Sequence, residues 1–425
     1  MVNLRLKHLL PALSLLFALT PIPDAHAADT STAIFNPAFH TLQLKVNGND
    51  MLPPVIVSDT DDHITISFDE LADERRYMRY ELIHCNARWQ PDGLVSTEFL
   101  DGFNEAAIDD YAYSQATTVH YVNYSFTIPN EDMHPKLSGN YLVRVYDERD
   151  PEATILQARF SILEHIMNVT ASVSSRTDID YNDAHQQLTI GVDFGTDIIT
   201  SPFTDLLVVV EQNGRQDNVA YASAPSRIAG TAAWYEHDRA LIFPAGNEYR
   251  RMEIISVNYP GMGVAELSYA DPVYHATLFT DRPRTGQPYV YDQTQHGHFR
   301  IREYNSDNPD TEADYVMTHF SLDLPEQANA GIFLDGDMVQ RRFSPESRMV
   351  FNRASGLYEQ SLLLKQGAYN YQYLTVPAGS DAGMTSPIEG DKYQTVNSYI
   401  IKVYARRPGQ RYDRLVGSAS IISGK

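Results

Sequence analysis

His84 and Cys85 have the residue types of a catalytic pair, because a cysteine nucleophile needs a histidine base beside it. They lie in a short apolar segment that alternates like a β-strand. Consecutive side chains of a strand point to opposite faces of the sheet, so these two groups cannot share a hydrogen bond. Cys85 is also the only cysteine of the chain, which excludes an intramolecular disulfide. We therefore expect Cys85 to be a buried, unreactive thiol.

His296 and His298 are the one pair with a spacing suited to zinc or copper. With Gly297 between them, both imidazoles would lie on one face of a strand. No third ligand stands at a typical spacing, and Arg300 and Arg302 follow on the same face. The sequence favours no metal and no cofactor here, and metal binding by the pair stays open as a second hypothesis.

Carboxylates gather between Asp59 and Glu74. A calcium loop needs Asp or Asn at alternate positions, closed by a glycine and a later glutamate, and this segment lacks that pattern. A glycosidase needs two carboxylates at a fixed distance, and nothing singles out a pair. We expect solvated turns at the acidic residues of this segment, which are Asp59, Asp61, Asp62, Asp69, Glu70, Asp73 and Glu74.

Other enzyme motifs are missing as well. No serine stands in a nucleophile-elbow pattern, and no glycine-rich loop leads into a helix. The sequence therefore predicts a non-enzymatic protein with no catalytic residues and no small-molecule substrate.

The elements that must position these residues are short strands. Apolar and polar residues alternate over 42–46, 64–68 and 121–128, and an apolar run at 206–210 leads into Asn213-Gly214, a hairpin signal. Strands at spacings of roughly ten residues are typical of sandwiches. We predict an all-β chain of tandem immunoglobulin- or fibronectin-like β-sandwich domains, with helix only in short pieces.

Three sandwiches fit the length of the chain. We place them at 28–165, 166–295 and 296–425. The first boundary lies where a strand at 158–163 runs out, and the second lies within 281–310, which is rich in Pro, Gly, Asn, Asp and Arg. An internal echo supports repeated domains, because YLVRVY at 141–146 resembles YIIKVY at 399–404. We expect both to be late strands near the edges of two related sandwiches.

The amino-terminal segment has the pattern of a secretory signal peptide. Basic residues at 5–8 precede an apolar stretch at 9–19, and Ala25-His26-Ala27 fits the small-residue cleavage rule. We expect residues 1–27 to be a signal peptide that is cleaved before Ala28. No later apolar run has the length of a transmembrane segment, so the sequence predicts an exported protein without one.

The formal net charge of −22 excludes a class of partners. Duplex binding needs a basic face, so we expect no nucleic-acid partner. An acidic surface of this kind is mostly a matter of solubility, with attraction of a basic partner as the alternative.

Aromatic residues concentrate after the His84–Cys85 strand, at Trp89, Phe99, Phe103, Tyr111 and Tyr113. They fill the core of the first sandwich, form an exposed recognition surface, or stack on sugars; the sequence leaves all three open. Arg and Trp together are typical of interface hot spots. Gly93 and Gly102 allow turns that would expose the segment.

Several short motifs give the chain a family resemblance. Residues 84–91 read HCNARWQP, 98–105 read EFLDGFNE and 137–141 read LSGNY. Further stretches stand at 365–373 and 411–417. With these motifs the chain resembles the plug proteins of the Bacteroidetes type IX secretion system over nearly its whole mature length, least so at about 201–246.

The resemblance implies a periplasmic, non-enzymatic sandwich protein on the periplasmic face of the outer membrane. Such a protein would associate with the SprA-type outer-membrane translocon and cover its periplasmic mouth. The alternatives are a periplasmic carbohydrate-binding or glycan-processing accessory protein, and a surface adhesin. We expect the partner contact in the Trp89–Glu105 segment, with candidates Trp89, Gln90, Phe99, Phe103, Asn104 and Glu105.

Overall fold

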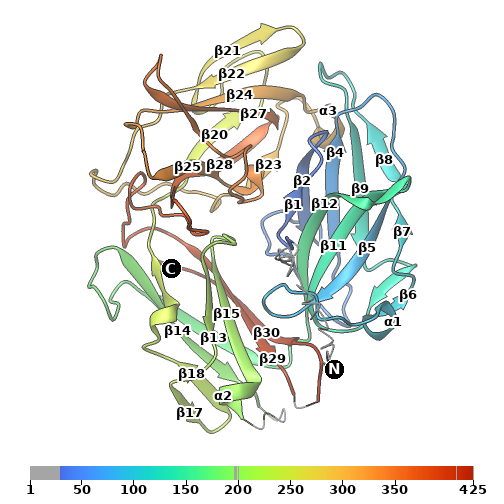
Figure 1. Ribbon diagram of the computed structural model, residues 1–425, viewed down its shortest axis with the longest axis vertical. Helices are drawn as coiled ribbons and strands as arrows, with labels where there is room; N and C mark the ends of the chain where they lie inside the picture. The colour runs from blue at the N-terminus through green and yellow to red at the C-terminus, as the bar shows by residue number, and fades with distance from the viewer. Residues whose placement is uncertain (1–28, 196–198, 200, 408, 425) are drawn as a thin grey trace, which may run out of the picture.

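The computed structural model describes residues 29–195, 199, 201–407 and 409–424. The expected signal peptide, residues 1–27, and its cleavage site before Ala28 lie outside these residues. The described chain is built almost entirely of strands, which form three pairs of facing sheets with a separate hydrophobic core in each (Figure 1). This confirms the prediction of an all-β fold made of sandwiches. Within the described chain, no helix is long and apolar enough to span a membrane.

The first sandwich shows why alternation predicts strands. In β9 (Val122–Ile128) every second side chain, beginning with Val122, is buried in the core. One sheet contains β1 (Ala33–Ile34), β12 (Asp150–Leu163), β11 (Gly139–Asp147), β5 (Met78–Cys85), β7 (Ala106–Ala107) and β3 (Val55–Val57). The facing sheet contains β2 (Phe39–Val46), β4 (Ile64–Glu70), β9 and β8 (Asp110–Tyr113). At one end lie α1 (Ser96–Phe99) and the small sheet of β6 (Leu100–Gly102) and β10 (Met133–Pro135).

The second sandwich is completed by the carboxyl-terminal strands. Asn213 and Gly214 both have positive φ and close the expected hairpin between β15 (Leu206–Gln212) and β16 (Val219–Ala222). One sheet contains β13 (Asn168–Ser174), β14 (His185–Asp193), β18 (Ala232–Tyr235), β17 (Arg227–Ala229) and β19 (Ile242–Pro244). The other contains β16 (Val219–Ala222), β15 (Leu206–Gln212), β29 (Ser398–Ala405) and β30 (Arg414–Ile422). The short helices are α2 (Pro202–Asp205) and η1 (Arg239–Leu241).

The third sandwich is inserted between β19 and β29 of the second. One sheet contains β20 (Arg250–Ile254), β28 (Gly367–Pro377), β23 (Phe299–Ile301) and β25 (Ala330–Asp335). The other contains β21 (Val264–Ala270), β22 (Val273–Leu278), β24 (Tyr315–Leu322), β27 (Leu357–Lys365) and β26 (Val350–Asn352). The short helices are α3 (Pro309–Glu312) and η2 (Asp337–Val339).

This insertion differs from the continuous domains expected at 166–295 and 296–425. The chain passes from the second sandwich to the third between Pro244, which ends β19, and Arg250, which begins β20. The Pro- and Gly-rich stretch at 281–310 comes later and connects strands within the third sandwich. In Figure 1 the red strands β29 and β30 accordingly lie beside the green strands of the second sandwich.

The two echoing hexapeptides are inner strands: 399–404 lies next to an edge strand, as expected, whereas 141–146 lies at the centre of its sheet, which corrects that expectation. Residues 141–146 belong to β11, which lies between β12 and β5, and 399–404 belong to β29, which lies between β15 and β30. Each strand is covered on both faces, because one side packs in its own core and the other faces a neighbouring sandwich. At that contact the Tyr404 hydroxyl donates to Asn140 Oδ1 at 2.7 Å.

Asp69 and Glu70 are buried, which corrects the expectation of solvated turns at these two positions. They end β4, where Asp69 faces the third sandwich and Glu70 faces the first. Asp69 Oδ2 accepts from the Lys365 ammonium and from the Tyr315 hydroxyl, both at 2.7 Å. Glu70 pairs with Arg76 at 2.7 Å within the first sandwich. A buried ion pair therefore joins the first and third sandwiches.

Candidate functional site

The turn after β5 is built by one asparagine. Asn86 Oδ1 accepts from the backbone N–H groups of Arg88 and Gln90, at 2.9 and 3.0 Å. Trp89 adopts a left-handed φ of 61°, which costs a non-glycine residue roughly 1–3 kcal/mol. These asparagine contacts hold the strained conformation and fix the direction of the Trp89 side chain.

Trp89 faces the other sandwiches and is not a free surface. Its side chain is buried, with the Arg159 guanidinium 4.6 Å from the ring centroid and the Lys402 ammonium 5.6 Å from it. Lys402 belongs to β29 of the second sandwich, so the tryptophan lies at the junction of two bodies. Gln90 is exposed, and its side chain accepts from Asn86 Nδ2 at 3.2 Å.

The motifs that carry the family resemblance meet at this junction. The Ala87 N–H donates to Asp413 Oδ2 at 2.9 Å, and the His84 ring contacts the Tyr412 ring edge-on. Gly139 lies between them, where an added Cβ would come within 2.8 Å of His84 Nε2 and 2.9 Å of the Asp413 carbonyl oxygen. Much of the idiosyncratic sequence therefore serves to join the first and second sandwiches.

Phe99 is a core residue. It is 3% exposed and lies in the hydrophobic cluster of the first sandwich, with its ring 5.9 Å from the rings of His84 and Tyr141. Phe99 therefore supports the loop from the core and is not available to touch a partner.

Phe103, four residues later, is 75% exposed. Its backbone is nevertheless held, because its N–H donates to the Asp132 carbonyl at 3.0 Å. Gly102 allows this close approach: its φ is 99°, and a Cβ there would lie 2.0 Å from the Asp132 oxygen. The result is an exposed aromatic side chain on a fixed loop, as recognition surfaces require.

Asn104 and Glu105 complete the loop. The Asn104 amide bonds both backbone groups of Leu82, accepting at 3.0 Å and donating at 2.9 Å, and so replaces a strand neighbour for β5. Glu105 is half-exposed and pairs with Arg79 at 3.1 Å. The structure thus places Phe103, Asn104 and Glu105 on one outward loop, and keeps Trp89 and Phe99 away from it.

His84 and Cys85 lie on opposite faces of β5, as expected. The His84 Nδ1 lies 2.5 Å from Asp92 Oδ2, whereas Cys85 packs in a separate small cluster with Trp89. The thiol is buried, and burial raises the pKa of Cys85 to about 12. It is therefore protonated at neutral pH, and the predicted burial is confirmed.

The His296–His298 pair is not on a strand face, which corrects that expectation. It lies in the turn before β23, where His296 and Gly297 both have positive φ. His298 Nδ1 lies 2.5 Å from Asp337 Oδ2. Across the described part of the chain, no group of three or more His, Cys, Asp or Glu side chains is placed to hold a metal ion.

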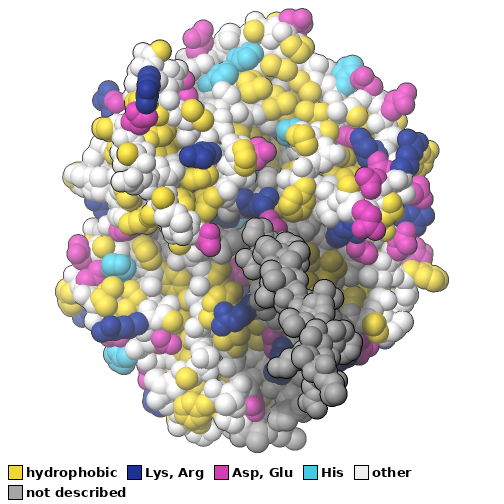
Figure 2. All heavy atoms as spheres, viewed as in Figure 1, with side chains coloured by type: hydrophobic (Ala, Val, Ile, Leu, Met, Phe, Trp, Pro, Cys, Tyr) yellow, Lys and Arg dark blue, Asp and Glu magenta, His cyan; other side chains and the backbone are white. Residues whose placement is uncertain are grey.

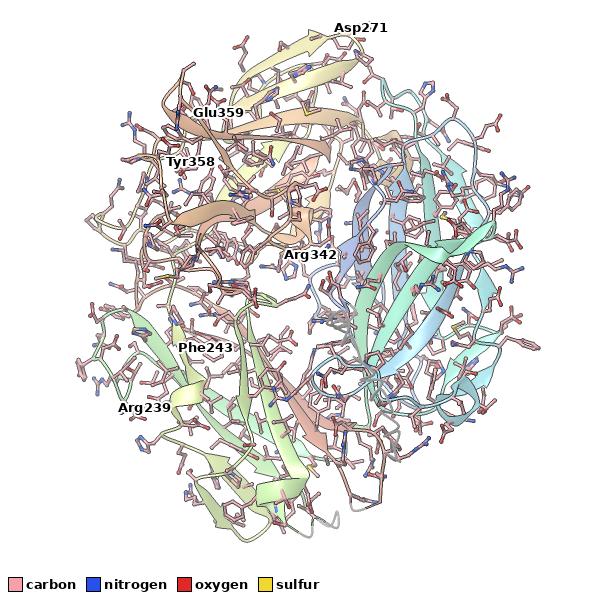
Figure 3. The ribbon with its side chains drawn as sticks, viewed as in Figure 1. Arg239, Phe243, Asp271, Arg342, Tyr358 and Glu359 are labelled. Atoms are coloured by element: carbon pink, nitrogen blue, oxygen red, sulfur yellow. The ribbon has the colours of Figure 1, made fainter. Side chains whose placement is uncertain are left out.

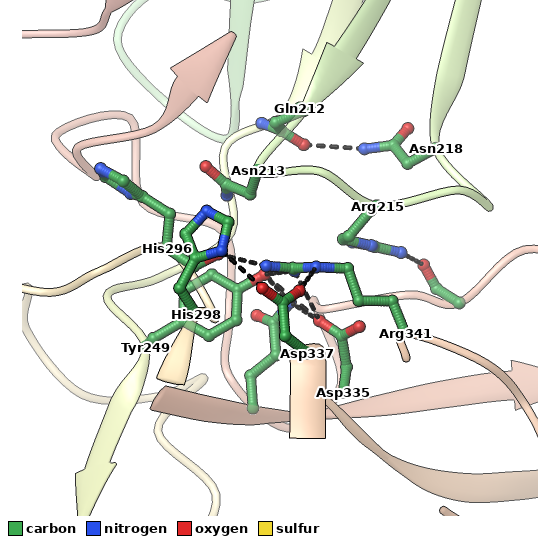
Figure 4. Close-up of polar contacts among 12 residues, drawn as sticks. Gln212, Asn213, Arg215, Asn218, Tyr249, His296, His298, Asp335, Asp337 and Arg341 are labelled. Atoms are coloured by element: carbon green, nitrogen blue, oxygen red, sulfur yellow. Dashed lines mark hydrogen bonds and ion pairs between the residues drawn. The ribbon is translucent and has the colours of Figure 1, made fainter. Parts of the chain in front are cut away.

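These histidines border a buried charge cluster around Arg341 (Figure 4). Arg341 donates to Asp337 Oδ1 at 2.6 Å and to the Tyr249 hydroxyl at 3.2 Å. Burial alone would raise the pKa of Asp337, but Arg341 and His298 outweigh it and hold that pKa well below its ordinary value. An added Cβ at Gly297 would lie 2.6 Å from the guanidinium, so this position must be glycine for Arg341 to fit.

A cavity of about 520 Å³ lies where the three sandwiches meet. Its wall includes Trp89 of the first sandwich, Lys402 of the second and Arg341 of the third.

Arg342 reaches from the third sandwich to the start of the described chain, where it pairs with Asp29 and lies over the Phe35 ring (Figure 3).

Sequence reasoning missed both this junction and the buried Asp69–Lys365 pair. The sequence held one signal for the pair: a lysine at the end of one apolar strand and an acidic residue at the end of another. Burying either charge costs free energy unless the two form an ion pair. No single-sequence pattern says which two strands meet across a domain boundary. For the cavity there was no signal, since its wall comes from residues hundreds of positions apart.

On the face shown in Figure 2, acidic and basic side chains are interspersed over the first sandwich instead of forming a single-sign patch. The outward feature of the candidate segment is the Phe103 loop, and the inward feature is the junction around Trp89.

The chain has clear relatives. Residues 39–164, the first sandwich, match the family model described as the type 9 secretion system plug protein 1st domain. A crystal structure of a hypothetical protein from Parabacteroides merdae, at 2.30 Å resolution, aligns with 42% sequence identity and a TM-score of 0.91, covering 93% of this chain and 99% of that one. Among curated proteins, none matches the chain. The chain therefore belongs to the plug protein family of the type IX secretion system, and its role is associated with that system.

Proposed function

We propose that the protein is a non-enzymatic periplasmic plug that covers the periplasmic opening of the SprA-type outer-membrane translocon barrel. The family match over residues 39–164 is the observation that carries the proposal. A pore wide enough for folded proteins leaks unless one end is closed. A body of three joined sandwiches supplies a rigid cover that needs no bond chemistry.

The Phe103 loop supports a contact on the first sandwich. Binding gains most from side chains that are already held in place, because less freedom is lost on association. Phe103 is exposed on a backbone fixed by Asp132, and Asn104 ties the same loop to β5. We propose that Phe103, Asn104 and Glu105 touch the barrel, with exposed Gln90 as a further candidate.

Capture from detergent-solubilised outer membranes tests the plug. The tagged protein is expected to co-isolate with a very large barrel protein identified by mass. Loss of the protein from cells is expected to make the outer membrane leaky to large hydrophilic antibiotics. A melting temperature that rises with an oligosaccharide, without barrel capture, would favour the glycan-binding alternative, and protease accessibility in intact cells would favour an adhesin.

Two matched variants test the contact itself. Phe103→Ala removes a ring of the first sandwich that is 75% exposed, and Phe279→Ala removes a ring of the third sandwich that is 64% exposed. Barrel capture is expected to fall for Phe103→Ala only, with unchanged melting temperatures. If only Phe279→Ala lowers capture, the plug stands and the contact lies on the third sandwich.

A further inference from the structure

The cavity at the junction has the size of a small-molecule site. Its volume of about 520 Å³ falls within the roughly 300–1,000 Å³ of typical ligand pockets. All three sandwiches contribute to its wall, so an occupant would touch each of them. The inference below is independent of the proposed plug function.

One wall of the cavity is cationic and aromatic. The Arg88 guanidinium lies 4.1 Å from the centroid of the Tyr221 ring. On the neighbouring aromatic residue, Trp89, the Arg159 guanidinium lies 4.6 Å from the ring centroid and the Lys402 ammonium 5.6 Å from it. Stacking of this kind holds guanidinium groups in place without using their N–H donors. In Arg159, Nε and Nη2 already donate to Thr30, which leaves Nη1 to face an occupant.

Two of these cations form no ion pair with a carboxylate of the described chain. Lys402 pairs with Glu211 at 3.0 Å. Among the residues that the structure describes, neither Arg88 nor Arg159 forms an ion pair; Arg159 Nε instead donates to the Thr30 carbonyl at 2.6 Å. Burial lowers the pKa of the Arg159 guanidinium, and the charges of Glu211 and Asp29 offset that shift only in part.

The charges of Arg88 and Arg159 both act on Tyr221. Burial and the nearby Glu211 carboxylate raise the pKa of the Tyr221 hydroxyl, and the charges of Arg88 and Arg159 oppose that shift. Arg88, Arg159 and Tyr221 all line the cavity, and the Arg88 guanidinium lies over the Tyr221 ring. The cavity wall carries four arginine and lysine side chains against the three carboxylates Asp50, Glu211 and Asp337, which is a small positive excess in a protein with a net charge of −22.

Another part of the wall is apolar. Leu52 comes from the loop after β2, and Ile400 and Ile422 come from the outer faces of β29 and β30. Leu52 and Ile422 are partly solvent-exposed, so this surface gains from being covered. The cavity thus offers cationic donors beside an apolar surface.

We propose that this cavity binds an amphiphilic anion, whose carboxylate or phosphate head is held by Arg88 and Arg159 and whose apolar body covers Leu52, Ile400 and Ile422. Guanidinium groups match both heads, because their planar forks donate two parallel hydrogen bonds. The aromatic faces of Trp89 and Tyr221 bound the space for the head.

Calorimetric titration with defined amphiphiles tests the site. Dodecanoate and dodecyl phosphate are the two probes, and neutral dodecyl maltoside, below its micellar concentration, is the comparison. We expect one or both anions to bind the full-length mature protein with a stoichiometry of one, and the neutral probe to bind at least about tenfold more weakly. The anion that binds identifies the head.

Variants connect the binding to the wall. Arg88→Gln with Arg159→Gln is expected to weaken binding by about tenfold or more, since each guanidinium supplies charged hydrogen bonds. Arg75→Gln is the matched control, because Arg75 also stacks on tyrosine rings, at 4.4 and 4.7 Å, but lies on an exposed surface away from the cavity.

A further variant guards against loss of folding. Ile400→Asp keeps both arginines and places a carboxylate in the cavity, so it is expected to weaken anion binding without loss of the melting transition. Equal binding of the neutral probe, equal binding by all variants, or no binding of either anion to the native protein would overturn the proposal.

Discussion

Two phenylalanines four positions apart illustrate how single residues of the segment divide their roles. Phe99 is 3% exposed and Phe103 is 75% exposed, although both stand in the same aromatic, glycine-containing stretch. The difference follows from the turn at Gly102, which sends the chain outward at the end of the first sandwich. Composition alone predicts an aromatic segment without saying which ring is in the core.

Alanine substitutions of these two rings should therefore differ sharply. Phe99→Ala is expected to cost about 3–5 kcal/mol in the free energy of unfolding, because it leaves a cavity in a packed core. Phe103→Ala should change it by less than about 0.5 kcal/mol, as for exposed positions. Urea unfolding of the two variants measures both values. Comparable losses in the two variants would show that Phe103 is scaffold.

Cys85 gives a second prediction at this scale. Its pKa of about 12 leaves almost no thiolate at neutral pH, and the thiolate is the reacting form. Native protein should therefore be labelled by a thiol reagent only as fast as it opens, with full labelling in denaturant. Cys85→Ser should cost about 1–3 kcal/mol, since a hydroxyl replaces a thiol in an apolar site. Rapid native labelling would contradict the burial.

At the scale of the element, the β6–β10 pair fixes the outward loop. Its last pairing joins Gly102 to Met133, and an added Cβ at Gly102 would lie 2.0 Å from the Asp132 oxygen. Gly93 is a matched position, since its φ of 75° is also positive but no atom lies within 4 Å of an added Cβ. Substitution at Gly93 therefore tests backbone strain alone, whereas substitution at Gly102 adds a steric clash.

Gly93→Ala should cost about 1 kcal/mol from the positive φ alone. Gly102→Ala should cost clearly more and should expose the amides of β6 and β10 to hydrogen exchange, because the two strands must part. Thermal unfolding and amide exchange measure these effects. If both variants behave alike, the close approach at Asp132 does not hold the loop.

Strands were the most predictable elements, because alternation reports directly which face is buried. The pattern at 121–128 predicted the buried face of β9, and Asn213-Gly214 predicted the hairpin of the second sandwich. Long-range pairing was not predictable: nothing local in 399–404 says that β29 joins β15 rather than a strand of the third sandwich. For the candidate site, the sequence singled out the Trp89–Glu105 segment but did not separate its inward residues from its outward ones.

At the scale of the whole molecule, buried polar contacts hold the sandwiches in fixed positions. Asp69 of the first sandwich accepts from Lys365 and Tyr315 of the third, and Asn140 of the first accepts from Tyr404 of the second. Buried groups of this kind tolerate only one arrangement, because any displacement leaves them unsatisfied. This rigidity suits a cover better than a set of linked, independent modules would.

The Asp69–Lys365 pair predicts a strong single-variant effect. Lys365→Met should cost about 3–5 kcal/mol, because it leaves the Asp69 carboxylate buried without its cation. Adding Asp69→Asn should restore more than half of that loss. Lys136→Met is the control, because the Lys136–Asp101 pair at 2.9 Å is exposed and worth at most about 1 kcal/mol. Equal losses for Lys365→Met and Lys136→Met would show that the interface does not depend on this pair.

The buried tyrosines predict how the whole molecule responds to alkaline pH. Burial raises the pKa of each phenol in a large set, which comprises Tyr121, Tyr141, Tyr315, Tyr369, Tyr371, Tyr373, Tyr399 and Tyr404. Below the ordinary pKa of 10.0 their contribution to stability is fully present. Above it the unfolded chain releases phenolic protons that the folded chain retains, so the free energy of unfolding falls with pH.

Lys365 acts in the opposite direction, because burial lowers the pKa of its ammonium and stability should rise with pH between that value and 10.5. One lysine is outweighed by many tyrosines, each of which removes about 1.4 kcal/mol per pH unit above pH 10. Against a total stability of about 5–15 kcal/mol, unfolding is expected within about one or two units above pH 10. Circular dichroism and phenolate absorbance, followed together, should change in one step. The contrary result would be ionisation of these tyrosines with apparent pKa values near 10 in a chain that stays folded. It would show that the phenols are accessible to solvent and that the sandwich cores and junctions are more loosely packed than in the structure.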